Sequence, residues 1–166
     1  MFEITITKKV ITKKKADFED ITVSEAISTI YNYSKDFIIF INWNGFKLPI
    51  DGVGFSQIYN DIIIMLEELE EGCDFSVNFL DSGFTAIWKF TTKGHFIDVE
   101  AEWVDIASYG YEKTTIEELE KVSNVITVNK REFIKEWNSL LKIIKDDLIN
   151  AGYDETLDGF EYLKAL

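Results

Sequence analysis

The chain is poor in the residues that mark many functional classes. Its 166 residues include one cysteine, one proline, one histidine and nine glycines. A lone cysteine excludes an internal disulfide and fits a reducing compartment. The scarcity of proline and glycine leaves no stretch with the composition of a linker, and the sequence contains no internal repeat.

Long hydrophobic runs are also missing. The longest aliphatic or aromatic runs cover residues 37–41 and 62–66, far short of the ~20 residues that a membrane-spanning helix needs. The first residues alternate in polarity and do not form the apolar segment of a secretory signal. We therefore expect a cytoplasmic protein that does not enter a membrane.

Basic residues are outnumbered, with 17 Lys and Arg against 30 Asp and Glu and a net charge of -13. Five lysines in the first 20 residues give that segment a charge of +1 and leave -14 on the other 146. Nucleic acid binding is disfavoured, because a phosphate backbone needs a basic footprint. The lysines are better explained as a solvated hairpin or an edge strand that they protect from pairing.

What is present is ample material for a core. Hydrophobic residues make up 46% of the chain, including thirteen Phe, seven Tyr and four Trp. All four tryptophans fall in phase with apolar stripes, which predicts that they pack in the core. The length fits one domain that spans residues 1–166.

Hydrophobic periodicity predicts an α+β fold. Alternation and turn residues predict strands near 2–7, 37–43, 46–50, 74–80, 84–91 and 95–104, and Asn44-Gly45 is typical of a tight hairpin. Capping residues and helical spacing predict helices near 22–34, 56–71, 115–122, 129–151 and 156–166. We predict a mostly antiparallel sheet of about six strands with helices packed against it, and a helical C-terminal third.

The stretch 95–105 is the most informative. Apolar and acidic residues alternate in it strictly: Ile97, Val99, Ala101 and Trp103 against Asp98, Glu100 and Glu102. Carboxylates in a row on one face repel one another, so this face indicates binding more than stability. With the loop that follows, it gives a predicted partner-binding set: Asp98, Glu100, Glu102, Asp105, Tyr109, Tyr111 and Glu112. A solvated face kept soluble by its charge is the competing interpretation.

The sequence contains little that indicates a catalytic site or a cofactor site. Alternate strand residues lie ~6.6 Å apart, which is wide for carboxylates that share one metal ion, and the Lys of a metal-dependent nuclease pattern is absent because Glu102 stands there. Cys73 and His95 have no motif that orients them as a nucleophilic pair. Gly52-Val-Gly54 lacks the third glycine of a dinucleotide fingerprint and predicts a strand-to-helix connection. We therefore assign no catalytic, metal or cofactor residue and expect no enzyme.

These features together resemble the immunity proteins of bacterial polymorphic toxin and contact-dependent growth inhibition systems. The resemblance covers the whole chain in kind: a small acidic α+β domain without an enzyme motif, with a carboxylate face at Asp98, Glu100 and Glu102. It implies a non-catalytic protein that needs no cofactor, binds a basic toxin domain, often a nuclease, and occludes its active site. Opposite charges would accelerate such an encounter.

Two other classes stay open at this point. A phage-type nucleic-acid mimic that inhibits a DNA-handling enzyme would need carboxylates in two rows spaced like phosphates. A small enzyme would need His95 or Cys73 in a deep pocket.

Overall fold

The computed structural model describes residues 2–8, 15–31, 37–106 and 116–166 and confirms the α+β class. The strands are β1 (Glu3–Lys8), β2 (Phe37–Trp43), β3 (Phe46–Asp51), β4 (Phe75–Asp81), β5 (Phe84–Lys93), β6 (Phe96–Ile106) and β7 (Val125–Asn129). The helices are α1 (Val23–Tyr31), α2 (Gly52–Glu71), α3 (Ile116–Leu119), α4 (Lys130–Ala151) and α5 (Glu161–Ala165).

The first three strands form an antiparallel sheet in the order β1-β2-β3. β2 is its central strand, as the apolar residues on both of its faces predicted: Ile39 is fully buried on one face and Ile38 is 2% exposed on the other. Asn44 and Gly45 both have positive φ, 49° and 89°, as a type I′ hairpin requires. The predicted turn is thus confirmed.

A second antiparallel sheet has the order β4-β5-β6-β7. Its first three strands are the predicted meander, so the strands divide between two sheets instead of forming one. The C-terminal third is mainly helical but also contains β7, which the sequence did not predict. β7 is short, and its last residue, Asn129, is also the residue that caps α4.

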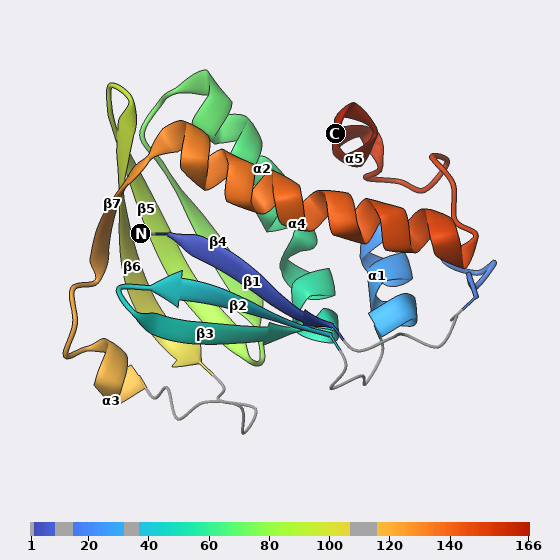
Figure 1. Ribbon diagram of the computed structural model, residues 1–166, viewed down its shortest axis with the longest axis horizontal. Helices are drawn as coiled ribbons and strands as arrows, with labels where there is room; N and C mark the ends of the chain where they lie inside the picture. Colours follow the sequence, from blue (N-terminus) through green and yellow to red (C-terminus); the bar gives the residue numbers. More distant parts are fainter. Residues whose placement is uncertain (1, 9–14, 32–36, 107–115) are drawn as a thin grey trace.

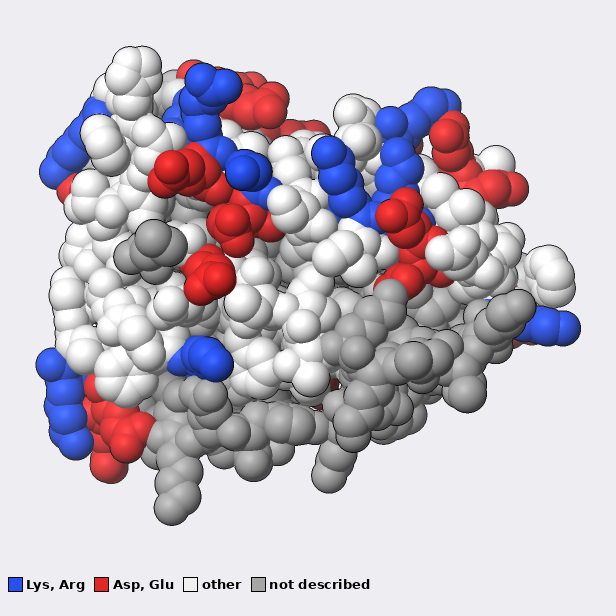
Figure 2. Space-filling view, in the orientation of Figure 1, with Lys and Arg blue, Asp and Glu red and all other residues white. Residues whose placement is uncertain are grey.

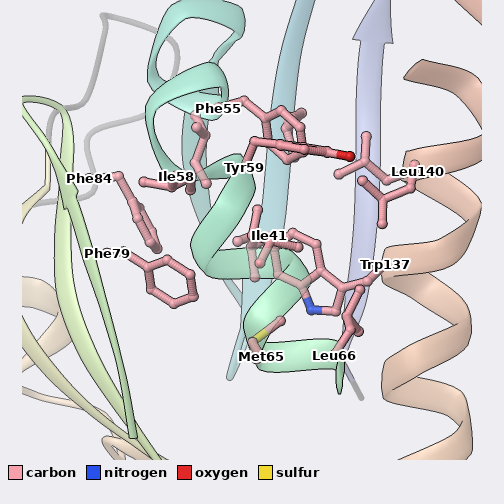
Figure 3. Packing of buried hydrophobic residues seen from close by; sticks show 14 of the residues in the cluster. Ile41, Phe55, Ile58, Tyr59, Met65, Leu66, Phe79, Phe84, Trp137 and Leu140 are labelled. Atoms are coloured by element: carbon pink, nitrogen blue, oxygen red, sulfur yellow. The ribbon is translucent and has the colours of Figure 1, made fainter. Parts of the chain in front are cut away.

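Residues from both sheets and from all five described helices form one hydrophobic core. The β1-β2-β3 sheet lies in front of the four-stranded sheet in Figure 1, and α4 crosses the view above β1. Trp43 of β2 joins the two sheets through ring contacts with Trp88 at 5.3 Å and Trp103 at 5.0 Å between centroids. In Figure 3, α2 lies between the two sides of the core, with Phe79 and Phe84 on one side and Trp137 of α4 on the other.

Local capping chemistry fixes where the helices begin. Thr22 and Glu25 form the predicted capping box: the Glu25 amide donates to Thr22 Oγ1 at 3.2 Å, and the Thr22 amide to Glu25 Oε2 at 2.9 Å. Asn129 caps α4 and Gly152 ends it with a φ of 106°, both as predicted. α2 begins four residues earlier than predicted, because Asp51 accepts from the Gly54 amide and caps it there. Gly52-Val-Gly54 is therefore the first turn of α2.

Gly52 is required by a close approach between helices. A Cβ atom at this position would lie 2.3 Å from Cβ of Tyr31 in α1. Tyr31 is itself fully buried, stacks on Phe37 at 3.8 Å between centroids, and donates a hydrogen bond to Asp147 of α4. Rotation of a side chain cannot relieve a contact between two Cβ atoms, so the backbones would have to separate.

We expect Gly52→Ala to lower the free energy of unfolding by about 2 kcal/mol, because the overpacking cost exceeds the gain in helix propensity. Urea unfolding followed by tryptophan fluorescence measures the change. Val53→Ala in the same helical turn is the matched control and should change stability by less than about 1 kcal/mol. Equal stability of Gly52→Ala and the wild type would contradict the close approach.

Candidate functional site

The four-stranded sheet presents one face to the core and one to solvent. The predicted inner residues of β6 are buried as expected, with Ile97 and Val99 fully buried and Ala101 2% exposed, while Trp103 is half-buried. We call the opposite side of this sheet the outer face. Register places these residues on it: Ser76, Asn78 and Leu80 of β4; Thr85, Ile87, Lys89 and Thr91 of β5; Asp98, Glu100, Glu102 and Asp105 of β6; Val125 and Thr127 of β7.

Asp105 reaches the outer face through a β-bulge. Trp103 pairs with Ala86 and Asp105 pairs with Thr85, so Val104 is an extra residue on β6. The bulge reverses the alternation: Asp105 points outward and Ile106, 7% exposed, points inward. Four of the predicted site residues, Asp98, Glu100, Glu102 and Asp105, therefore form one row along β6.

In one half of this row, Asp98 is compensated by a cation and a hydroxyl on neighbouring strands, and Glu100 faces a lysine without forming an ion pair with it. Lys93 forms an ion pair with Asp98, and Thr127 Oγ1 donates to Asp98 at 2.6 Å. These hydrogen bonds, from Lys93 first and then Thr127, hold the pKa of Asp98 below its ordinary value. Lys89 lies directly opposite Glu100 in the register. The outer side of β6 is thus acidic, as predicted, but the outer face of the whole sheet is not, because β5 contributes lysines to it.

The other half of the row is uncompensated. Glu102 lies opposite Ile87 and Asp105 opposite Thr85, and within the described ranges neither carboxylate has an ion-pair partner. Apolar side chains are exposed at the same end of the face, namely Leu80 at 69% and Val104 at 54%. We call the group Leu80, Ile87, Glu102, Val104 and Asp105 the acidic end.

A hollow of about 300 Å³ adjoins the acidic end. Glu102 and Trp103 of β6 form one wall, and Leu119, Glu120 and Val122 form the other. The pairing of β6 with β7 ends at Glu100 and Val125. Next to it, the segment after α3 lies beside β6, where the Ala101 amide donates to the Asn124 carbonyl at 2.7 Å. The sequence did not indicate this hollow, since its walls come from segments far apart in the chain.

The remaining predicted partner-binding residues, Tyr109, Tyr111 and Glu112, lie outside the described residues.

A second exposed apolar feature lies far from the sheet in the sequence. Phe18 is fully exposed in a turn that hydrogen bonds hold in place. The Asp17 amide donates to the Tyr153 hydroxyl at 3.0 Å, and that hydroxyl donates to Asp20. The Ala16 amide donates to the Ala151 carbonyl at 2.9 Å. The sequence analysis did not predict this turn; the one local signal for it is an apolar residue between two acids, in Asp17-Phe18-Glu19.

Cys73 and His95 are exposed side chains at turns. Cys73 follows the C-cap of α2 and is exposed, and His95 lies in the turn between β5 and β6. Neither lines the hollow beside Glu102. Their placement gives no support to a nucleophilic pair in a deep pocket.

Among the described residues, the one buried carboxylate is that of Asp81, which ends β4 beside the first turn of α2. Asp81 is 4% exposed and accepts from the Gly83 amide at 3.0 Å. A Cβ atom on Gly54 would lie 2.6 Å from Asp81 Oδ2 and 3.3 Å from Asp51 Oδ1. Burial, and to a lesser degree the charge of Asp51, raise the pKa of Asp81, while the Gly83 amide opposes the shift. Both carboxylates have structural roles: Asp51 caps α2 and Asp81 stabilises the turn after β4.

The raised pKa predicts how Asp81 affects stability. The folded state binds the Asp81 proton more tightly than the unfolded state, so this contribution is complete below the ordinary pKa of 3.8 and is lost as the pH rises through the folded pKa. Asp81→Asn should therefore be more stable than the wild type at neutral pH, and the difference should shrink towards acid. Urea unfolding at pH 7 and about pH 4.5 tests this. Asp146→Asn removes an exposed carboxylate and controls for net charge; an equal gain in both variants would contradict a specific role of Asp81.

Within the described ranges, no group of three or more His, Cys, Asp or Glu side chains could hold a metal ion. None of the described helices is long and apolar enough to cross a membrane. No protein-family model matches the chain, and neither does any curated protein or solved structure.

Proposed function

We propose that the protein neutralises a basic bacterial toxin domain, of the nuclease class, by stoichiometric binding, as an immunity protein. The observation that carries the proposal is the acidic end, where uncompensated carboxylates surround exposed apolar side chains on an open sheet face. Exposed apolar area supplies a surface that can be buried on binding, and carboxylates without partners attract a basic protein. The two kinds of group together favour a protein-binding surface over a merely solvated face.

The mechanism is occlusion. A net charge of -13 accelerates the encounter with a cationic nuclease domain. The carboxylates of Glu102 and Asp105 then occupy positions that substrate phosphates would take, and Leu80 and Val104 exclude water from the contact. No covalent chemistry and no cofactor are involved.

Duplex mimicry is less well supported by this face. A mimic needs two rows of carboxylates, but the strand beside β6 presents Thr85, Ile87, Lys89 and Thr91 in register with the acidic row. α4 carries five Lys or Arg residues among its acids, and Figure 2 shows charges of both signs interspersed over this part of the surface. Neither surface offers a continuous anionic track.

Co-expression tests the proposal. The reading frame directly upstream of the gene would be expressed with and without this protein, and bacterial growth would be measured. We expect the upstream product to arrest growth, this protein to restore it, and the two purified proteins to form a complex of equal stoichiometry. An upstream product that is harmless, or that does not bind, would overturn the immunity function.

Charge reversal locates the surface. We expect Glu102→Lys with Asp105→Lys to weaken binding to the toxin domain at least about tenfold, with the loss mainly in the association rate. The matched control, Glu67→Lys with Asp146→Lys, makes the same charge change at exposed helical positions and should weaken binding by less than about threefold. Phe18→Ser tests the other exposed apolar feature. Loss of binding in Phe18→Ser but not in the sheet variant, measured by calorimetry, would move the interface to the Phe18 turn.

A further inference from the structure

We infer that the hollow between β6 and α3 receives an arginine side chain from the basic partner. This inference rests on the proposed function and names the group that the same surface would recognise. It starts from the hollow of about 300 Å³ whose lining residues include one tryptophan, Trp103, and two glutamates, Glu102 and Glu120.

The walls of the hollow are held in place before any ligand binds. The Ser123 carbonyl accepts hydrogen bonds from two residues of the β2-β3 hairpin, from Trp43 Nε1 at 3.3 Å and from Asn44 Nδ2 at 2.7 Å. The side chain of Asn124 donates to the Ala101 carbonyl at 3.3 Å, and the Asn124 carbonyl accepts from the Ala101 amide. Binding would therefore cost little ordering of the protein.

The indole of Trp103 is fixed as well. Its ring meets the edge of Trp43 at 5.0 Å between centroids and 86° between planes. The side chain is half-buried, and it also lines the hollow. A fixed aromatic residue in a hollow that acidic residues also line is suited to a guanidinium group, which is planar, weakly hydrated and able to stack on indole.

The charges around the hollow have one sign. Glu102 and Glu120 are both exposed carboxylates at its rim, on opposite walls, and neither has an ion-pair partner within the described ranges. The five donors of a guanidinium can reach two carboxylates at once, whereas an ammonium is a single strongly hydrated point of charge. Val122, which is half-buried and lines the hollow, can contact the methylene groups of the arginine stem. Charge and shape thus favour arginine over lysine.

A small probe tests the hollow without the toxin. N-acetyl-arginine amide would be titrated into the full chain labelled with ¹⁵N, and the indole N–H resonances would be followed, with Trp103→Phe used to assign that of Trp103. We expect a saturable shift of the Trp103 resonance in the millimolar range, as suits so small a ligand. The corresponding citrulline amide, which has nearly the same shape without the charge, should give no saturable shift.

Matched variants distinguish binding in the hollow from a general attraction of the probe to an acidic protein. Glu102→Gln with Glu120→Gln should weaken probe binding at least about tenfold, because both partners of the guanidinium are lost. Glu100→Gln with Glu117→Gln removes the same charge from β6 and α3 at positions that do not line the hollow and should bind within about twofold of the wild type. Unchanged resonances of the other indoles report that each variant is folded.

The outcomes distinguish the two proposals. No saturable shift with the arginine probe, an equal shift with citrulline, or an equal loss in both pairs of variants would overturn the arginine site and leave the immunity function standing. Probe binding at the hollow together with a harmless upstream product would overturn the immunity function and leave the arginine site standing.

Discussion

The contact between Trp43 and the indoles of Trp88 and Trp103 is the interaction on which the rest of the structure depends. Trp43 is the last residue of β2 and is fully buried, and through these rings it joins the β1-β2-β3 sheet to the inner face of the four-stranded sheet. Because that inner face packs in the core, alternation along β6 places Asp98, Glu100 and Glu102 on the solvent side, and the bulge at Val104 places Asp105 there as well. The same tryptophan holds the Ser123 carbonyl and so sets one wall of the hollow beside Glu102.

Local patterns could be predicted from the sequence because they have local causes. The hairpin at Asn44-Gly45, the capping box at Thr22 and Glu25 and the N-cap at Asn129 each follow from residues within four positions of one another. The inner face of the meander could be predicted too, since burial of one face requires period-two alternation. These features fixed the α+β class and the faces of β6.

Features that depend on distant partners could not be predicted in this way. Nothing in the sequence of β7 states that it pairs with β6, and nothing near Val104 marks the bulge that turns Asp105 outward. The need for glycine at position 52 likewise comes from the close approach of Tyr31, a residue in another helix. The division of the strands between two sheets likewise depends on which surfaces pack together. One sheet and two sheets would bury the same apolar residues, so the hydrophobic pattern does not distinguish them.

The electrostatics of the candidate site also depend partly on local sequence and partly on distant residues. A row of carboxylates is visible in the sequence of one strand, but its potential depends on the strands beside it, and these place Lys93 and Lys89 next to Asp98 and Glu100. A carboxylate that is already close to a lysine attracts a second cation only weakly, because the lysine offsets its charge. Solvent screens the remaining attraction. The capacity to bind a basic partner is therefore concentrated at Glu102 and Asp105, where the neighbouring strand supplies Ile87 and Thr85. Because the exposed apolar side chains and the hollow lie at this same end, attraction, desolvation and shape act together there, which is the combination that makes a few residues dominate an interface.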